Sequence, residues 1–419
     1  MYLKLKYYKR NKYKSKSIKI NICGSKSETN RLLIIKKLYK NIKLYNMSNS
    51  NDTKLMLLSL STSKNKKIIN VKDAGTVMRF LVSYFSILKR REVILTGSNR
   101  MNKRPIYNLV LALNNIGCDI KYIKNIGYPP IKIIGKNIKK NYIKINSNIS
   151  SQFITSLILI GPKLKKGLKI KLLNDKISLS YINMTINILK KLNFKIKFKK
   201  NYIIINNYKK KNNKKLKYYI ESDWSSASYF YSLISILDIK EIILTKFKKK
   251  SYQGDSVISL IYNKFFGVNT IFKKNNIIII KKIKNFKLPK FFKLNLKSTP
   301  DIAQTIIVTC SVLKIKCLLK GLKTLKIKET DRLIALKKEL KKVGTLTKIT
   351  NETIEIIGFK NKKNKKIIIN TYKDHRMAMS FSVLAIKNKI FIENPKTVNK
   401  SYPNYWNDFK KIGFSAKII

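Results

Sequence analysis

The chain of 419 residues carries a formal charge of +72, because 92 lysines and arginines face only 20 acids, and 44% of its residues are hydrophobic. This apolar share excludes a simple disordered chain, and the length predicts two or three domains of about 150 residues. The four cysteines are scattered, no apolar run reaches the ~20 residues of a membrane helix, and the first residues lack the apolar segment of a signal peptide, so we expect a soluble cytoplasmic protein with reduced thiols.

Six helices are predicted where a polar or small residue precedes an apolar run. They begin near residues 28, 75, 151, 225, 301 and 375, and after the first the spacing is 76, 74, 76 and 74 residues. A second series is expected to begin near residues 53, 105, 181, 255, 331 and 403. Four of its members end near Gly117, Asn193, Gly267 or Gly344 and precede two short strands around a polar turn. The chain is therefore predicted to contain six copies of one unit with two helices and several strands.

Six such units group most simply as three and three, which predicts two α/β domains. Residues 207–219 are the most polar stretch near the middle of the chain and are expected to hold the crossing between the domains. Repetition alone is equally consistent with a scaffold. The positions of the rare residue types are what indicates chemistry.

Arginine is rare here, with nine among the 92 basic residues. Lysine is spread along the whole chain among isoleucine and asparagine, and all three have A/T-rich codons, so base composition explains most of the charge. If this bias replaces dispensable arginines with lysine, an arginine that remains marks a position that needs a planar, two-pronged donor for carboxylate or phosphate. For Arg10, Arg90 and Arg91 a surface ion pair is the simpler interpretation. The remaining six are Arg31, Arg79, Arg100, Arg104, Arg332 and Arg376.

The rare residues gather at the starts of the first helix series. Helix N-termini expose unpaired N–H groups and a partial positive charge, so each can bind an anion. If three units close around an axis in each domain, these ends would converge on the cleft between the domains. The motifs are GSKSETNR (24–31), DAGTVMR (73–79), SSQ (150–152), DWSSAS (223–228), TPDIAQT (299–305) and DHRMAM (374–379).

Two of these regions suit phosphate or carboxylate. Ser27 and Arg31 are four residues apart and share one helical face, with Lys26 beside them, which suits a phosphate ester. A capped surface helix is the alternative there. Arg104 precedes Pro105, a good first helical residue, and would grip a carboxylate at a helix entrance.

The segment KETDR places Lys328, Glu329, Asp331 and Arg332 together before a helix. Its acids could simply cap that helix, and the same holds for Asp301 after Pro300. Because acids are so few, a proton-transferring Glu329 beside an anion-binding Arg332 is the stronger hypothesis. With one histidine, no GxGxxG and no P-loop, we predict a site without metal or cofactor, rich in cations and supplied with carboxylates.

Ten motifs in sequence order now identify a resemblance. The chain resembles the EPSP synthases (3-phosphoshikimate 1-carboxyvinyltransferases) of the enolpyruvyl transferase family over nearly all of its length. Each motif is weak alone, but ten in order are highly specific. They are GSKSETNR, DAGTVMR, LTGSNRMNKRPI, SSQF, ESDWSSASYF, YQGD, PDIAQT, KETDRL, DHRMAM and NPKTVNKSYPNY.

The resemblance implies an α/β fold of two domains, each built from three βαβαββ units as an inside-out α/β barrel, with the active site in the interdomain cleft. It implies an N-terminal domain at 21–220 on the shikimate 3-phosphate side. Residues 1–20 and 221–419 would form the C-terminal domain, on the phosphoenolpyruvate side. The expected reaction transfers the enolpyruvyl group of phosphoenolpyruvate to the 5-hydroxyl of shikimate 3-phosphate and releases phosphate, on the route to chorismate and aromatic amino acids.

The resemblance also implies site residues. Catalysis would use Asp301 at the 5-hydroxyl, and Glu329 with Lys26 at the methylene carbon of phosphoenolpyruvate. Shikimate 3-phosphate would contact Lys26, Ser27, Arg31, Ser150, Ser151, Gln152, Ser178, Asp301 and Lys328. Phosphoenolpyruvate would contact Lys26, Gly75, Arg104, Gln152, Arg332, Arg376 and Lys400. We expect a monomer with these two small-molecule partners, no specific nucleic acid and no membrane.

Six positions depart from the family pattern: Cys23 and Phe80 where proline is common, Asp73 and Thr324 where asparagine is usual, and Ser222 and Trp224 where the family has small residues. One alternative is the sister enzyme that transfers the same group to UDP-N-acetylglucosamine, but it relies on a cysteine in a mobile loop, whereas Cys118 lies at a predicted helix-to-strand junction. The composition is also compatible with a basic nucleic-acid-binding protein or with an inactive relic. The intact arginines, acids and histidine of the motifs favour catalysis.

Overall fold

The computed structural model describes residues 1–8, 16–39, 42–63, 65, 67–148, 150–174, 178–208, 216–361 and 366–419. These residues form two compact units. Unit 1 consists of Met1–Ser25 and Glu221–Ile419, and unit 2 of Lys26–Ile220. The chain therefore begins in unit 1, builds unit 2 and returns to unit 1. Arg10 and residues 209–215 of the polar stretch lie outside the described residues.

Both predicted helix series are confirmed, each start lying within a few residues of its expected position. The first series comprises α2 (Lys26–Tyr39), α4 (Gly75–Ser86), α6 (Ser151–Ile160), α8 (Trp224–Ile236), α10 (Ala303–Leu313) and α12 (His375–Phe381). The second comprises α3 (Asn51–Ser61), α5 (Tyr107–Asn115), α7 (Leu179–Lys191), α9 (Ile258–Phe266), α11 (Arg332–Lys342) and α13 (Tyr405–Lys411). Gly267 ends α9 in the left-handed conformation, as the glycine signal predicts.

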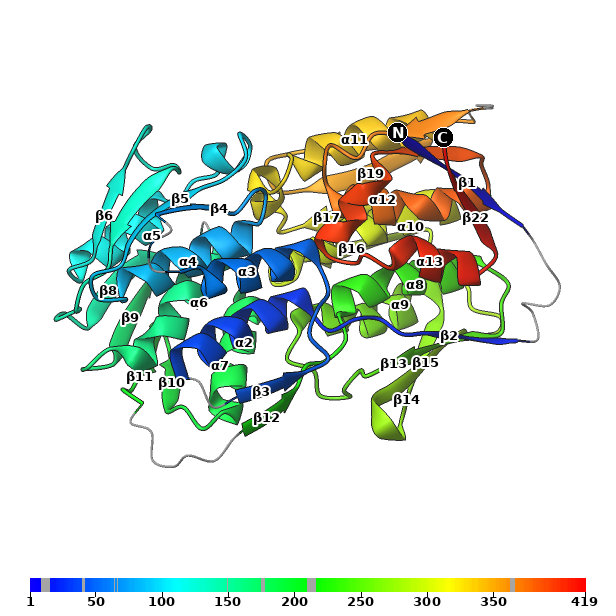
Figure 1. Cartoon of the computed structure of the whole chain (residues 1–419). Coiled ribbons are helices and arrows are strands. Elements are labelled where there is room, and N and C mark those ends of the chain that lie inside the picture. The colour runs from blue at the N-terminus through cyan, green and yellow to red at the C-terminus, as the bar shows by residue number, and fades with distance from the viewer. Residues whose placement is uncertain are drawn as a thin grey trace. The chain divides into compact units, whose positions relative to one another are not determined.

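The strands form small mixed sheets in both units (Figure 1). Unit 2 holds β12 (Leu216–Tyr219) beside β3 (Ile42–Tyr45), β4 (Ile68–Asn70) with β5 (Glu92–Thr96), β7 (Ile131–Ile134) and β6 (Asp119–Tyr122), and β8 (Tyr142–Asn146) with β9 (Leu168–Leu173), β11 (Tyr202–Ile205) and β10 (Ile196–Lys199). Unit 1 holds three four-stranded sheets. The first orders β2 (Ser17–Ile20), β13 (Glu241–Thr245), β15 (Ile277–Lys282) and β14 (Val268–Lys273), and the second orders β16 (Phe291–Asn295), β17 (Lys316–Lys320), β19 (Ile354–Phe359) and β18 (Thr345–Ile349). The third orders β20 (Ile367–Ile369), β21 (Ile390–Glu393), β1 (Tyr2–Tyr7) and β22 (Phe414–Ile418).

Each four-stranded sheet repeats one topology. Its first strand runs parallel to the second, and two antiparallel strands complete the sheet, as in β4, β5, β7 and β6. In the last sheet of unit 1, the N-terminal strand β1 pairs antiparallel with both β21 and β22. This repeat is the βαβαββ unit that the family resemblance implied. Among the described residues, the repeat that contains α2 and α3 shows only the parallel pair of β12 and β3.

The helices of the first series lie in the interior of each unit. Nearly every residue of α4, α6, α8 and α10 is buried, whereas α3, α5 and α11 bury about half of theirs. A helix that is apolar on all sides belongs in a core, so the sheets cover the outside. This is the inside-out arrangement, and the polar motifs lie at the N-termini of these central helices.

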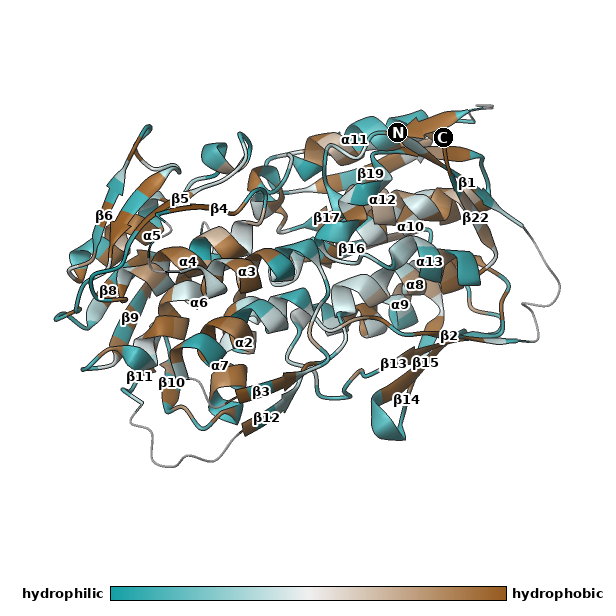
Figure 2. Cartoon of the chain, in the orientation of Figure 1, coloured by the Kyte–Doolittle hydropathy of each residue, from teal (hydrophilic) through white to brown (hydrophobic). Residues whose placement is uncertain are grey.

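The alternation of lysine with isoleucine has a structural explanation. In β9, Leu168, Ile170 and Leu172 are buried while Lys169 and Leu173 are exposed, which is the pattern of a strand with one face on the core. Figure 2 shows the apolar colour along β4, β13 and β15. Many lysines therefore occupy the outer face of half-buried strands. Among the described residues, no helix combines the length and the apolar character that crossing a membrane requires.

Candidate active site

One buried arginine organises the polar centre of unit 1. Arg332, the first residue of α11, is 2% exposed and donates to three carboxylates. Its Nε lies 2.7 Å from Asp374 Oδ2, its Nη1 2.9 Å from Asp301 Oδ1, and its Nη2 3.0 Å from Glu329 Oε2. Burial alone would lower the pKa of Arg332, but Asp374, Glu329 and Asp301 outweigh burial and raise it. The guanidinium is therefore a permanent cation that fixes the three acids.

Two lysines complete the surroundings of these acids. Lys328 Nζ lies 3.3 Å from Asp301 Oδ1, and Lys400 Nζ lies 3.0 Å from Glu329 Oε1. The side chains of Asp301 and Glu329 are each 12% exposed, so both are shielded but reachable. Both oxygens of Glu329 thus face a cation: Oε1 faces the Lys400 ammonium, and Oε2 accepts a hydrogen bond from Arg332.

Arg376, in the first turn of α12, approaches Asp301 from a third direction. Its Nη1 donates to the backbone oxygen of Asp301 at 2.9 Å, and its Nη2 lies 3.5 Å from Asp301 Oδ2. Asp374 caps α12 by accepting from the backbone N–H of Arg376 at 2.8 Å. Unit 1 therefore brings together the predicted site residues Asp301, Lys328, Glu329, Arg332, Arg376 and Lys400.

Unit 2 contains a second buried arginine with a different environment. Arg31 of α2 donates from Nε to Thr185 Oγ1 at 2.8 Å and from Nη1 to the Ser27 backbone oxygen at 2.7 Å. Its Nη2 reaches Thr155 Oγ1 at 3.5 Å. All of these acceptors are neutral, and no described carboxylate forms an ion pair with Arg31. Burial lowers the pKa of Arg31 to about 10, which still leaves it charged at neutral pH. A buried cation among neutral acceptors favours an anionic ligand.

Lys26, at the start of α2, forms an ion pair with Asp52 of α3, with 3.0 Å between Nζ and Oδ2. Ser150 caps α6 by accepting from the backbone N–H of Gln152. Ser178 precedes α7 with a φ of 51°, an uncommon backbone conformation for serine. Because Arg31 contacts Thr155 in α6 and the Tyr181 carbonyl in α7, unit 2 gathers the starts of these helices around one arginine.

Gly75 and Arg104 are in direct contact in unit 2. A Cβ added to Gly75 would lie 2.6 Å from Arg104 Nη1 and 3.0 Å from its Nη2, so only glycine lets this guanidinium lie against the start of α4. Arg79 donates to the carbonyls of Gly75 and Pro105, which ties the two segments together. Gln152 Nε2 donates to Thr76 Oγ1 at 3.3 Å and so joins the start of α6 to the start of α4.

The sequence analysis did not predict several residues that contribute to the candidate site. Asp374 lies in the DHRMAM motif, and its status as one of few acids could have marked it as the partner of Arg332. Asp52, in the first turn of α3, carries the same signal. Thr155 and Thr185 carry none, because threonine is common in buried helices. Arg91, expected on the surface, is instead buried and donates to the Ser63 carbonyl at 3.0 Å.

Three departures from the family pattern also have a structural setting. The ring of Phe80 lies under Arg31, 5.5 Å from its guanidinium carbon, which adds a cation–π contact. Asp73 accepts a hydrogen bond from the Ser98 hydroxyl. Thr324 is buried near the start of the 3₁₀ segment Lys323–Ile327.

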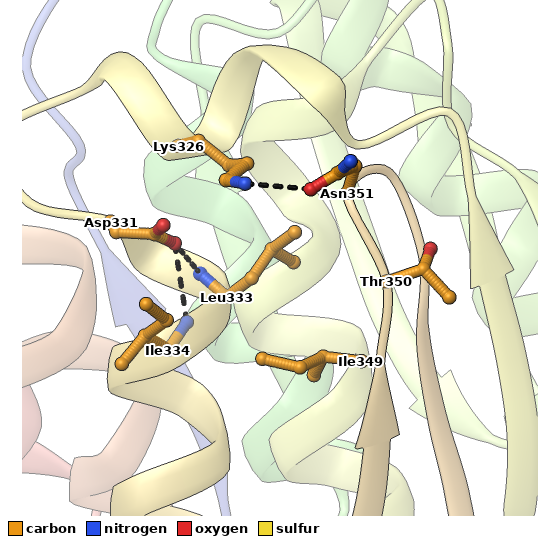
Figure 3. A pocket seen from close by; sticks show the side chains of 7 residues that line it. All are labelled: Lys326, Asp331, Leu333, Ile334, Ile349, Thr350 and Asn351. Atoms are coloured by element: carbon orange, nitrogen blue, oxygen red, sulfur yellow. Dashed lines mark hydrogen bonds between the residues drawn. The ribbon is translucent and has the colours of Figure 1, made fainter.

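A hollow of about 390 Å³ lies between the start of α11 and the turn after β18 (Figure 3). Its polar groups satisfy one another: Lys326 donates to Asn351 at 2.8 Å, and Asp331 accepts from the backbone N–H groups of Leu333 and Ile334. None of the predicted site residues lines it. Among the described residues, no three histidine, cysteine or acidic side chains are grouped as metal ligands.

Comparisons with known proteins agree with one another. The model of the EPSP synthase (3-phosphoshikimate 1-carboxyvinyltransferase) family matches residues 58–409. The 3-phosphoshikimate 1-carboxyvinyltransferase of Bacteroides fragilis (strain YCH46) is 38% identical over 402 residues, which cover 95% of this chain and 96% of that protein.

Solved structures share the fold. The EPSP synthase of Acinetobacter baumannii gives a TM-score of 0.70 at 19% identity, with 100% of both chains covered. The enolpyruvyl transferase NikO of Streptomyces tendae gives 0.71 at 10% identity, covering 99% of this chain and 98% of that one. At these identities the two structures support the enolpyruvyl transferase fold alone.

Proposed function

The chain belongs to the EPSP synthase family, and from this we propose which substrate and which step of the reaction each of its two sets of polar residues serves. Its activity is that of a 3-phosphoshikimate 1-carboxyvinyltransferase in the shikimate pathway. The reaction moves the enolpyruvyl group of phosphoenolpyruvate to the 5-hydroxyl of shikimate 3-phosphate and releases phosphate. The observation that carries the proposal is the cluster in which Arg332 holds Asp301, Glu329 and Asp374.

Shikimate 3-phosphate is assigned mainly to unit 2. Arg31 supports this assignment, because its charge is buried and the oxygens that accept its hydrogen bonds are neutral. A bound phosphate would give the Arg31 guanidinium an anionic hydrogen-bond acceptor in addition to these neutral ones. The proposed contacts are Lys26, Ser27, Arg31, Ser150, Ser151, Gln152 and Ser178, with Asp301 and Lys328 proposed at the ring hydroxyls.

Phosphoenolpyruvate is assigned to the cations that the family resemblance implies. Arg376 and Lys400 each keep 11% of the side chain exposed, so they can reach a ligand, whereas the Arg332 side chain is 2% exposed. In unit 2 the Arg104 guanidinium lies against Gly75. The proposed contacts are Lys26, Gly75, Arg104, Gln152, Arg332, Arg376 and Lys400.

The proton transfers are assigned to the two reachable carboxylates. Asp301 takes the proton of the 5-hydroxyl as that oxygen bonds to C2 of phosphoenolpyruvate, and Glu329 delivers a proton to the methylene carbon C3. The resulting tetrahedral intermediate then loses phosphate, and Glu329 removes a proton from C3 to restore the double bond. The Lys400 ammonium, 3.0 Å from Glu329, is the proton source that supports this role, and Lys26 assists. Positioning of two anions against fixed cations supplies much of the remaining acceleration.

A phosphate-release assay tests the assignment of the acceptor. Purified protein with phosphoenolpyruvate is expected to release phosphate when shikimate 3-phosphate is added and not when UDP-N-acetylglucosamine is added. Release with the nucleotide sugar alone would contradict the proposal.

The four cysteines are free thiols, which supports the cytoplasm as the compartment we propose. We also propose that the protein is a monomer.

Gly75→Ala tests the contact between Gly75 and Arg104. The new Cβ would lie 2.6 Å from Nη1, so the guanidinium must move away from the start of α4. We expect KM for phosphoenolpyruvate to rise by about threefold or more, because the charge-assisted hydrogen bond from Arg104 to this substrate would be weakened. Steady-state kinetics with each substrate varied in turn would measure it. Gly358→Ala is the matched control, because its Cβ would meet only Leu346 at an ordinary 3.6 Å; equal effects of the two changes would refute the assignment.

A further inference from the structure

Asp255 is a buried acid that the proposed mechanism does not use. It lies in the 3₁₀ turn Gly254–Val257 and is 4% exposed. Its Oδ2 accepts a hydrogen bond from the Ser225 hydroxyl, and its Oδ1 has no hydrogen-bond partner among the described residues. Burial raises the pKa of Asp255 to about 6, against the opposing effect of Arg376. An acid that is desolvated and only half satisfied costs free energy, so its retention needs a reason.

Helix capping does not supply that reason. Asp223, Asp331 and Asp374 each accept from a backbone N–H at the start of a helix. No such contact to the Asp255 carboxyl exists among the described residues. Asparagine would accept from Ser225 equally well, so what distinguishes aspartate at this position is its negative charge.

The charge acts through Ser225 on Arg376. Gln253 fixes the turn against the start of α8, because it accepts from the Trp224 N–H at 3.1 Å and donates to the Ser222 carbonyl at 2.8 Å. The Ser225 hydroxyl hydrogen is committed to Asp255, so the Ser225 oxygen is left as an acceptor, and Arg376 Nη2 donates to it at 3.3 Å. The other arm of the guanidinium donates to the Asp301 carbonyl at 2.9 Å. Ser225 and Asp301 thus hold the two arms of Arg376.

We propose that Asp255 is a positioning residue that, through the Ser225 hydroxyl, orients the Arg376 guanidinium toward phosphoenolpyruvate. The inference rests on the proposed role of Arg376 in binding that substrate. Ionised Asp255 keeps Ser225 turned as an acceptor and adds a negative charge behind the guanidinium. When Asp255 is protonated, that charge is lost and the serine can turn its hydrogen elsewhere.

The charged groups that face Asp255 come from three elements: Arg376 from α12, Asp301 from the 3₁₀ turn Pro300–Ile302, and Asp223 from the start of α8. Arg376 favours the ionised form, whereas the two carboxylates disfavour it. Because the pKa of Asp255 is raised to about 6, the acid is ionised above that pH and becomes neutral below it. Positioning of Arg376 should therefore weaken, and KM for phosphoenolpyruvate should rise, as the pH falls through about 6. The substrate phosphate titrates in the same range, so a variant that lacks the Asp255 charge must serve as the reference.

The test compares Asp255→Asn, Ser225→Ala and the double variant with the wild-type enzyme between pH 5.5 and 8. At pH 7.5 we expect Asp255→Asn to raise KM for phosphoenolpyruvate about fivefold, because the negative charge behind the Arg376 guanidinium is lost, with kcat and KM for shikimate 3-phosphate within about twofold. The ratio of variant to wild type should fall toward one at low pH. Ser225→Ala should give a similar rise, and the double variant should be no worse than the more affected single one.

The control is Glu339→Gln, which neutralises another fully buried carboxylate of unit 1, one held by Lys342 and Tyr372. It is expected to leave KM for phosphoenolpyruvate unchanged. If Asp255→Asn keeps wild-type KM at every pH, the positioning role is wrong while the proposed function stands; if wild-type protein releases no phosphate, the proposed function itself fails. Should Asp255→Asn not fold, Ser225→Ala decides, and an unchanged KM there overturns the proposal.

Discussion

Replacing Glu329 with glutamine is expected to lower kcat by about 10²–10⁴-fold, the usual contribution of a positioned acid or base. Glutamine keeps the size of the side chain and can still accept from Arg332 or Lys400, so the change removes mainly the capacity to exchange a proton. KM for both substrates should change much less than kcat. Phosphate release under saturating substrates would measure the effect, and turnover within about threefold of wild type would exclude Glu329 from proton transfer.

Asp331→Asn is the matched control for Glu329→Gln. Asp331 belongs to the same segment, but its carboxylate only caps α11 through the N–H groups of Leu333 and Ile334. Asparagine caps helices about as well as aspartate, so both kcat and stability should stay near wild type. A large loss of kcat in this control would indicate that the segment responds to any change of charge.

Replacing Arg332 with methionine is expected to destabilise unit 1 by about 3–5 kcal/mol, because three acids would lose their common buried partner. Unfolding can be followed in unit 1 alone, since both tryptophans of the chain, Trp224 and Trp406, belong to it. A urea titration of tryptophan fluorescence would give the change in midpoint. Lys337→Met removes the same charge from an exposed position of the same helix and should shift stability by no more than about 0.5 kcal/mol. Similar midpoints for the two variants would show that Arg332 does not stabilise the cluster.

A milder change at Arg332 separates stability from binding. Arg332→Lys keeps the charge but loses the planar fork, so at most some of the contacts with Asp301, Glu329 and Asp374 survive. We expect a raised KM for phosphoenolpyruvate in this variant. An unchanged KM would count against its role in binding that substrate.

The sequence predicts the repeated units well because their signals are local. Polar residues before apolar runs mark the helix starts, and the C-terminal glycine of α9 and the Lys/Asn turns mark the hairpins. The position of the central helices is less visible, since the apolar run of α6 is compatible with several buried elements. The pairing of β2 with β13 and of β1 with β21 joins segments more than two hundred residues apart, and no local pattern specifies it.

The candidate site is visible in the sequence through the rarity of its residue types. Arginine and acids are uncommon in this lysine-rich chain, so Arg31, Arg332 and Glu329 stand out among their neighbours. Rarity cannot show that Arg332 binds three carboxylates, because that depends on how α11, α12 and the turn at Asp301 pack. The link from Asp255 through Ser225 to Arg376 likewise exists only in three dimensions.

The role of Glu329, which we propose adds and removes a proton at the methylene carbon, is tested most sharply by running the reaction in deuterium oxide. The added proton comes from an exchangeable group, so the methylene carbon of the product should contain deuterium, detectable by mass spectrometry or proton NMR. Glu329→Gln should show neither turnover nor deuterium incorporation on the same timescale. Product formed by wild-type enzyme without any deuterium at that carbon would rule out this proton transfer.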